Sequence, residues 1–157
     1  MDDIDSLQRR LTSLGLKLPA VPRPVANYVP AVRSERLVYT SGQLPSADGT
    51  VQYCGKLGLD LDEKAGYEAA RLAGLNALAA VLSLVDRPED IIQIVRVTGY
   101  VNSAPGFVGQ SAVINGASDL LAELFGPAGR HTRAAVGVAE LPLNAAVEID
   151  LIVELKA

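Results

Sequence analysis

The chain has 157 residues, of which 49% are hydrophobic and 20% are charged, a balance typical of one folded domain rather than of a disordered chain. The formal net charge is −4 and the basic residues are scattered, which argues against a nucleic-acid partner. A single Cys and a single His exclude an intramolecular disulfide and make a zinc site improbable. No apolar run approaches the ~20 residues that span a bilayer, and no secretory signal is visible. We therefore expect a cytoplasmic protein without a membrane partner.

The N-terminal segment predicts a short helix followed by an extended arm. A helix is expected at residues 4–14, because apolar side chains repeat there at helical spacing and Gly15 follows. These side chains are Ile4, Leu7, Leu11 and Leu14. Between residues 18 and 30, four prolines exclude a helix and favour an extended arm. They are Pro19, Pro22, Pro24 and Pro30.

Three short strands are expected after or within the end of this arm. Their positions are residues 27–29, 37–41 and 51–53, where residues that favour strands cluster. Asp48 and Gly49 are a typical hairpin-turn pair, so they predict the tight turn that precedes the third strand.

Two long helices and one strand fill the middle of the chain. Asp60 and Glu63 have the spacing of a capping box, so the first helix is expected to begin there and to run to about residue 85. Residues 91–101 are rich in β-branched side chains and predict a central strand. The second helix is expected at residues 107–125, and Gly126 and Pro127 follow it.

The C-terminal stretch contains two strands, at residues 133–139 and 147–155. In the second strand apolar side chains alternate with Glu148, Asp150 and Glu154, so one face is apolar and the other carries carboxylates. An antiparallel hairpin is the pairing considered for these strands. Arg133 and Glu148 need not touch within one chain under this pairing, and a cleft within the chain or across a subunit boundary is left open.

These elements predict an α+β fold in which a mixed sheet carries both long helices on one face. One domain spans residues 1–157, with the N-terminal helix at residues 1–15 added to a core at residues 16–157. The second sheet face is too apolar to be simply solvated and too charged for a dry core. Association of copies in a ring with clefts between subunits would resolve this conflict.

The C-terminal motif resembles that of a known family. Arg133-x-x-Val136-x-Val138-Ala139-x-Leu141-Pro142, followed by Val147-Glu148-Ile149, is similar to the signature of the RidA/YjgF family, the reactive-intermediate deaminases also labelled endoribonuclease L-PSP. The resemblance covers roughly residues 24–157. It implies a chorismate-mutase-like fold and a homotrimer with a site at each subunit interface.

The resemblance also implies the roles of five residues. Arg133 matches the residue that binds the substrate carboxylate, and Glu148 matches the residue that positions or activates water. Tyr28, Gly42 and Asn115 match substrate-binding positions of the family. From this one sequence alone, each has a plainer reading: an ion pair for Arg133, a solvated strand residue for Glu148, a strand-end turn at Gly42, ring packing for Tyr28 and a cap or subunit bridge for Asn115.

Four positions depart from the family pattern. Asn27 stands where Pro is usual, and Ala135 replaces a Cys that often follows the arginine. His131 and Thr132 replace the more usual Pro-Ala pair before Arg133. His131 is expected to be a loop residue rather than a base, and the pocket wall near it is expected to differ.

The implied activity is hydrolysis of 2-imino or enamine acids to 2-oxo acids and ammonia, as in a 2-iminobutanoate/2-iminopropanoate deaminase. A guanidinium can bind the substrate carboxylate, and a carboxylate of the protein can orient the water. The chemistry therefore requires no metal or cofactor. One alternative is a non-catalytic trimer that binds small metabolites. A ribonuclease is less favoured, because the chain is acidic and no basic groove is visible.

Overall fold

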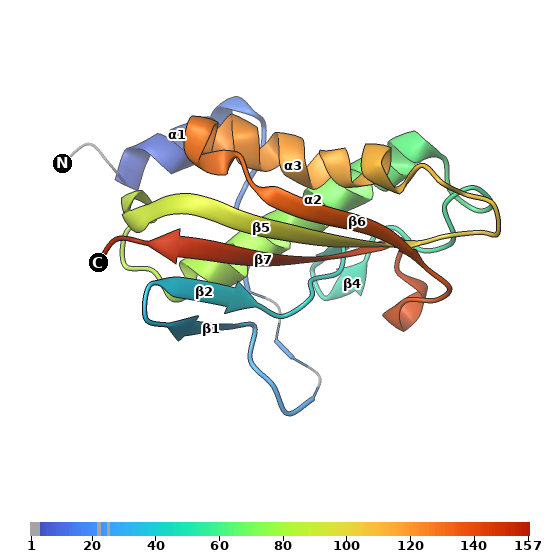
Figure 1. Cartoon of the computed structure of the whole chain (residues 1–157), viewed down its shortest axis with the longest axis horizontal. Coiled ribbons are helices and arrows are strands. Elements are labelled where there is room, and N and C mark those ends of the chain that lie inside the picture. Colours follow the sequence, from blue (N-terminus) through green and yellow to red (C-terminus); the bar gives the residue numbers. More distant parts are fainter. Residues whose placement is uncertain (1–3, 22, 25) are drawn as a thin grey trace.

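A five-stranded mixed sheet with two long helices on one face forms the centre of the molecule (Figure 1). The computed structural model describes residues 4–21, 23–24 and 26–157. The strand order is β1-β2-β7-β5-β6, with β5 and β6 parallel and all other neighbours antiparallel. The elements in chain order are α1 (Ile4–Ser13), β1 (Ala31–Ser34), β2 (Leu37–Thr40), β3 (Ser46–Ala47), β4 (Thr50–Val51), α2 (Glu63–Leu82), η1 (Pro88–Asp90), β5 (Ile91–Asn102), α3 (Gln110–Phe125), η2 (Gly126–Gly129), β6 (Thr132–Val138), η3 (Pro142–Asn144) and β7 (Val147–Leu155). The predicted α+β fold class is confirmed.

The main core lies between the sheet and the helices α2 and α3. Alternate residues of β7 are buried against the helices, as the sequence pattern predicted, and they are Val147, Ile149, Leu151, Val153 and Leu155. The two helices approach closely, because a Cβ on Gly116 of α3 would lie only 2.0 Å from the backbone oxygen of Tyr67 on α2. Small residues at this crossing therefore set the distance between the two helices.

Helix α1 packs on the outside of the helix layer. Leu7 and Leu11 are buried, at 6% and 1% exposure, against leucines of α2 and α3, and the Arg10 guanidinium donates to the carbonyl of Leu124. The predicted amphipathic helix is confirmed, although Leu14 is exposed and the Ile4 side chain lies outside the described residues. No helix of the described chain is long and apolar enough to cross a membrane.

Three local predictions at the N-terminal side need correction. The first strand is Ala31–Ser34 rather than residues 27–29, because it pairs with β2 through a tight turn in which Glu35 has a φ of 53°. The N-cap of α2 is Asp62, whose side chain accepts from the Ala65 amide at 2.8 Å, whereas Asp60 accepts from the Lys56 amide. The strand expected at residues 51–53 corresponds to β4 (Thr50–Val51), and its partner β3 (Ser46–Ala47) was not predicted. Pro22, one of the four arm prolines, lies outside the described residues.

The turn at Asp48 and Gly49 is confirmed. Both residues have positive φ angles, 52° and 77°, and they join β3 to β4. This is the backbone conformation that hairpin turns require and that glycine adopts without strain.

The hairpin pairing of the two C-terminal strands is wrong. β5 lies between β6 and β7, and β6 runs parallel to β5 with Arg133 opposite Val97. The helix α3 connects β5 to β6, as a crossover connection between parallel strands requires.

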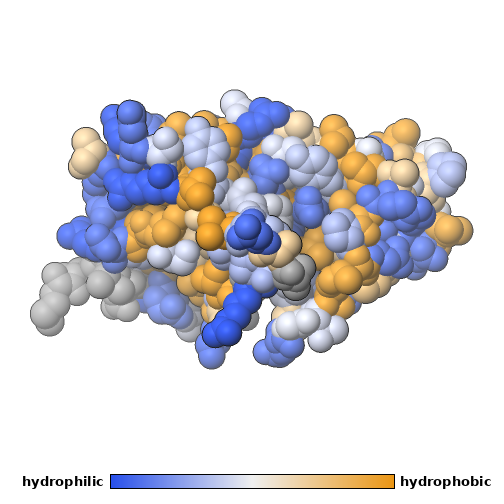
Figure 2. All heavy atoms as spheres, turned by 90° about the horizontal axis from the view of Figure 1, so that it is seen from below, coloured by the Kyte–Doolittle hydropathy of each residue, from blue (hydrophilic) through white to orange (hydrophobic). Residues whose placement is uncertain are grey.

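The face of the sheet opposite the helices combines apolar and acidic side chains. Val32, Tyr39 and Val136 are 51%, 39% and 44% exposed, and their register partners place them on the same face as Glu148 and Asp150. We call this surface the open face. Figure 2 views the molecule from the β1 edge of the sheet and shows hydrophobic patches between hydrophilic side chains on that side.

Candidate functional site

Arg133 lies near the start of the edge strand β6 and faces α3. Its register partner Val97 is a core residue, so the parity of the strand turns the Arg133 side chain toward the helix layer. The Nη1 atom donates to Asn115 Oδ1 at 2.8 Å and to Ser118 Oγ at 3.1 Å, and Nη2 donates to the Ser111 carbonyl at 3.3 Å. Within the described part of the chain, no carboxylate forms an ion pair with Arg133. The guanidinium is thus held in place while its charge is not neutralised.

A second tier of hydrogen bonds holds Ser118. His131 Nδ1 lies 2.7 Å from the Gly129 carbonyl, and His131 Nε2 lies 2.9 Å from Ser118 Oγ. A carbonyl only accepts, so Nδ1 carries the proton, and in the neutral ring Nε2 accepts from the serine hydroxyl. The hydroxyl in turn accepts from Arg133. His131 therefore orients the residues that hold the guanidinium.

Glu148 lies early on β7 and faces the open side of the sheet. Its register partner is Tyr100, and the segment around Gly42 covers it from the side of β2. A Cβ on Gly42 would lie 2.6 Å from Glu148 Cδ, so only glycine leaves room for this carboxylate. Backbone hydrogen bonds of 2.8 and 2.9 Å between Gln43 and Ile149 fix the segment against β7. Gly42 and Glu148 are thus neighbours.

The surroundings of Glu148 favour its protonated form. Burial raises the pKa of the Glu148 carboxyl above its usual value, and the charge of Asp150 on the same face raises it further. Burial also raises the pKa of Asp150, while hydrogen bonds from Tyr100 and Thr98 and the charge of Arg96 oppose this shift. The Tyr100 hydroxyl donates to Asp150 Oδ2 at 3.4 Å. A carboxyl whose pKa lies closer to neutral pH is better suited to exchange protons with a substrate.

Tyr28 precedes β1 in an irregular segment and is 51% exposed. Together with Gly42 and Gln43 it lines a cavity beside β2. Tyr28 is therefore placed with the Glu148 group of residues rather than with Arg133.

The predicted site residues fall into two groups on opposite faces of the sheet. The Arg133 half-site consists of Arg133, Asn115 and Ser118, and the Glu148 half-site consists of Glu148, Gly42 and Tyr28. The Arg133 side chain faces α3 and the Glu148 side chain faces the open side, with β5 between their strands. A single protomer does not bring the two half-sites together.

Sequence reasoning missed the contributions of Ser118 and Tyr100. Ser118 follows Asn115 by three residues on a helix, which places both side chains on one face, and this spacing was the available signal. Nothing in the pattern around Tyr100 indicated that it lies opposite Glu148, because that contact depends on the pairing of β5 with β7.

Known proteins resemble this chain over most of its length. The model of a family described as "YjgF/chorismate mutase-like, putative endoribonuclease" matches residues 8–155. Protein TCP17 of Trypanosoma cruzi is 44% identical over 146 residues, which cover 92% of this chain and 91% of that protein. A crystal structure of a protein of unknown function from Agrobacterium tumefaciens matches with a TM-score of 0.91 and 45% identity, over 98% of this chain and 94% of its own.

A more distant structure, that of Escherichia coli TdcF with bound serine, matches with a TM-score of 0.63 and 26% identity, over 87% of this chain and 94% of its own. The lower score accompanies a smaller covered share of this chain. The family match nevertheless extends from within α1 to the end of β7. The chain belongs to the YjgF/chorismate-mutase-like family, as its C-terminal motif indicated.

Proposed function

We propose that this protein hydrolyses reactive 2-imino acids, and the enamines that tautomerise to them, to 2-oxo acids and ammonia, at sites shared between the subunits of a homotrimer in the cytoplasm. The observation that carries the proposal is the presence of two incomplete half-sites: a fixed guanidinium without an ion-pair partner in the described chain and a carboxyl with a raised pKa. Family membership supports it, and so does the serine bound to the E. coli relative, since serine carries the carboxylate that Arg133 would bind.

Arg133 is suited to bind the substrate carboxylate. A guanidinium binds a carboxylate through two parallel hydrogen bonds, which fixes orientation as well as affinity. Asn115 and Ser118 hold the side chain from one side without adding charge. The full positive charge is therefore left for an anionic ligand.

Glu148 supplies the proton transfers. Its carboxylate accepts a proton from a water molecule as the water oxygen bonds to C2 of the imine, which gives a tetrahedral carbinolamine. The protonated imine nitrogen thereby becomes the amine of the carbinolamine, and the carboxyl returns its proton to this nitrogen. As the C–N bond breaks and ammonia leaves, the carbinolamine hydroxyl loses its proton to the Glu148 carboxylate, which passes it to the ammonia, and the 2-oxo acid remains. One water is consumed for each ammonia released, and no electrons are transferred. Placing water and substrate together suffices for a substrate that is already reactive.

Association of copies is what would bring the half-sites together. Arg133 lies on an edge strand, which a second copy can approach, and the open face has exposed apolar side chains that favour burial. The Arg133 half-site of one subunit would then face the Glu148 half-site of the next. The exposed, unpaired thiol of Cys54 fits the reducing cytoplasm.

A non-catalytic trimer that binds small metabolites is the second candidate, favoured by the serine bound to E. coli TdcF. It would use the same residues and would differ only in turnover. Ribonuclease activity has less support, because the open face carries Glu148, Asp150 and Glu154 from one strand, and these carboxylates repel phosphate.

The activity test uses 2-iminobutanoate generated freshly by a dehydratase, with ammonia release followed over the uncatalysed decay. Acceleration by the wild type that is lost in both Arg133→Ala and Glu148→Gln supports the deaminase. Glu154→Gln is the matched control, since Glu154 lies on the same strand and face but pairs with Arg36 at 2.9 Å. A wild type that binds 2-oxobutanoate without accelerating the decay identifies the non-catalytic binder.

The shared site is tested by mixing two inactive variants. Arg133→Ala and Glu148→Gln subunits, combined by coexpression, restore an intact interface wherever an Arg133 from one variant meets a Glu148 from the other. Random assembly would recover about a quarter of the wild-type activity. No recovery of activity would contradict the shared site. A mass in light scattering other than three times the 16.5 kDa chain would contradict the trimer.

A further inference from the structure

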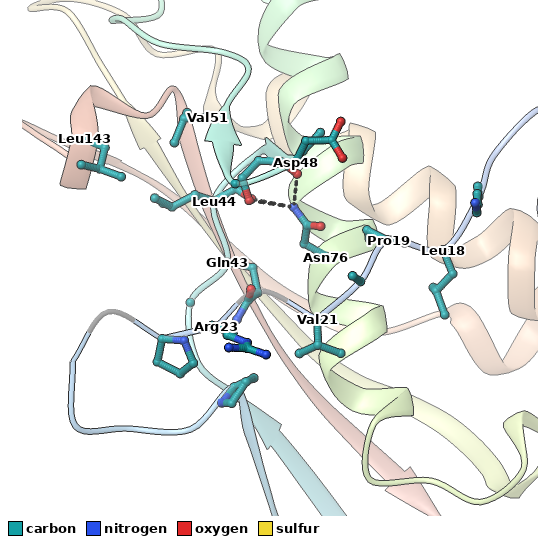
Figure 3. A pocket seen from close by; sticks show the side chains of 18 of the residues that line it. Leu18, Pro19, Val21, Arg23, Gln43, Leu44, Asp48, Val51, Asn76 and Leu143 are labelled. Atoms are coloured by element: carbon teal, nitrogen blue, oxygen red, sulfur yellow. Dashed lines mark hydrogen bonds between the residues drawn. The ribbon is translucent and has the colours of Figure 1, made fainter.

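A large cavity lies between the N-terminal arm, the segment at residues 42–49 and helix α2. Its volume is about 960 Å³, and arm residues 17–21, 23 and 24 contribute its wall (Figure 3). We call this cavity the arm pocket. Gly42 and Tyr28, both assigned to the Glu148 half-site, also line it. Gly42 thus borders both the arm pocket and the carboxylate to which the proposed function assigns the proton transfers.

The size of the arm pocket exceeds what a small imino acid needs. Sites for drug-sized ligands measure roughly 300–1,000 Å³, so the arm pocket lies at the upper end of that range, whereas a four-carbon acid has only a handful of heavy atoms. Leu18, Val21 and Leu44 give it apolar walls. A ligand with a longer side chain would fill more of this space and bury more apolar surface.

Two largely buried polar side chains mark the inner wall. Asn76 on α2 is 1% exposed, and its Nδ2 atom donates to the carbonyls of Leu44 and Ser46, each at 2.9 Å. Among the described residues none donates to Asn76 Oδ1, which leaves an acceptor at the pocket wall. Gln43 is 7% exposed and donates to the Ser41 carbonyl. Such groups fix the orientation of a bound ligand.

Two cations of the arm give the pocket its charge. Lys17 and Arg23 line it against the single carboxylate of Asp48, although the whole chain has a net charge of −4. In Figure 3 the Arg23 side chain lies within the pocket, near Gln43. In the part of the chain that is described, the Arg23 guanidinium has neither a hydrogen-bond nor an ion-pair partner. An unpartnered guanidinium in a cavity is a binding group for a carboxylate.

We propose that the arm pocket binds the far end of the ligand and that this protein prefers 2-imino and 2-oxo acids whose side chain ends in a second carboxylate. The inference rests on the proposed function for the reacting end of the ligand, which Arg133 of a neighbouring subunit binds. Arg23 binds the second carboxylate, and the apolar wall contacts the methylene groups between them.

The test measures binding of stable 2-oxo acids to the full-length protein by calorimetry at low ionic strength. The probes are 2-oxobutanoate, 2-oxohexanoate, which has a longer apolar chain, and 2-oxoglutarate, which has a terminal carboxylate. We expect 2-oxoglutarate to bind about tenfold more tightly than 2-oxohexanoate, because one charge-assisted hydrogen-bonded pair contributes about that gain in affinity. Arg23→Gln should remove most of this preference and leave 2-oxobutanoate binding unchanged. Arg33→Gln is the control, because Arg33, on β1, lies outside the pocket and donates to the Glu35 carbonyl in the following turn.

Equal affinity for 2-oxoglutarate and 2-oxohexanoate, or a preference that survives Arg23→Gln, overturns the inference. So does the absence of binding by any of the three acids. A preference that depends on Arg23 supports it even if no imino acid is hydrolysed, since the readout is binding and not turnover. If Arg133→Ala binds all three acids as the wild type does, the site assignment of the proposed function fails while the arm pocket stands.

Discussion

Arg133 and Glu148 differ in what surrounds them. Arg133 donates three hydrogen bonds to uncharged groups of α3, and a histidine orients one of those groups. Glu148 has neither a hydrogen-bonded nor an ion-paired partner within the described chain, and burial beside Asp150 raises its pKa. One side chain is fixed in position at constant charge, and the other is placed where its charge can change.

These surroundings suit a binding role for Arg133 and a proton-transfer role for Glu148. A binding group is most effective when its orientation is set before the ligand arrives, and a proton-transfer group is most effective when its pKa approaches the working pH. Both residues lie on strands, so alternation and strand order place them on opposite faces. The separation of the two side chains in one chain is thus a consequence of sheet geometry, and the proposed association of copies would reunite them.

Removing the binding group should have the largest effect. Arg133→Ala leaves the ligand carboxylate without its partner, and we expect kcat/KM to fall about a thousandfold, equivalent to roughly 4 kcal/mol. Arg133→Lys keeps the charge but not the paired hydrogen bonds, so it should recover only part of the loss. Arg130→Ala, an exposed neighbour whose backbone carbonyl is retained, is the control. Similar losses in Arg130→Ala and Arg133→Ala would contradict a specific role.

Removing the titrating group should lower turnover more than binding. Glu148→Gln keeps the shape of the side chain and abolishes proton transfer, so kcat should fall about a hundredfold while the affinity for 2-oxobutanoate changes little. Steady-state kinetics and calorimetry separate the two quantities. Equal losses in turnover and affinity would show that Glu148 binds rather than reacts.

Strand alternation in the sequence allowed the orientation of Glu148 to be predicted. The regular spacing from Val147 to Leu155 correctly placed Glu148 on the face opposite the core. The pairing of β6 could not be read in the same way, because nothing near Arg133 indicates that β5 rather than β7 is its neighbour. Pairing between strands distant in sequence depends on how α3 crosses the sheet.

Short and irregular elements were harder to place. β1 has four residues, of which three are exposed, so its pattern carries little information, and the expected strand fell at residues 27–29. The two aspartates before α2 have similar capping chemistry, and only the observed contact of Asp62 with the Ala65 amide distinguishes them. The family resemblance named Arg133, Asn115, Gly42 and Glu148 as candidates because each motif is local in sequence, and their roles stay predictions.

Crowding the Glu148 half-site should have a smaller effect than removing its carboxyl. In Gly42→Ala the new methyl group would meet Glu148 Cδ at 2.6 Å, so the carboxylate must move and kcat should fall about tenfold. The double variant Gly42→Ala/Glu148→Gln should lose no more than Glu148→Gln alone, since both changes act on one group. Additive losses would mean that Gly42 acts independently of Glu148.

The smallest effect is expected from Asp150→Asn, and it concerns the pH profile. A general base works when ionised, so kcat/KM should rise as pH increases through the pKa of Glu148, which burial first and Asp150 second raise above the usual carboxyl value.

Removing the Asp150 charge lowers the pKa of Glu148, because the ionised form is no longer repelled. The acid limb of the kcat/KM profile should therefore move to lower pH. Its midpoint should stay above the usual carboxyl range, since the burial of Glu148 remains. On the plateau above the acid limb, where pH no longer changes the rate of either protein, the two rates should differ less than about threefold. Glu154→Gln, whose partner is Arg36, should leave the limb in place, and a shift of the Asp150→Asn limb to higher pH would contradict the assignment of Glu148 as the titrating base.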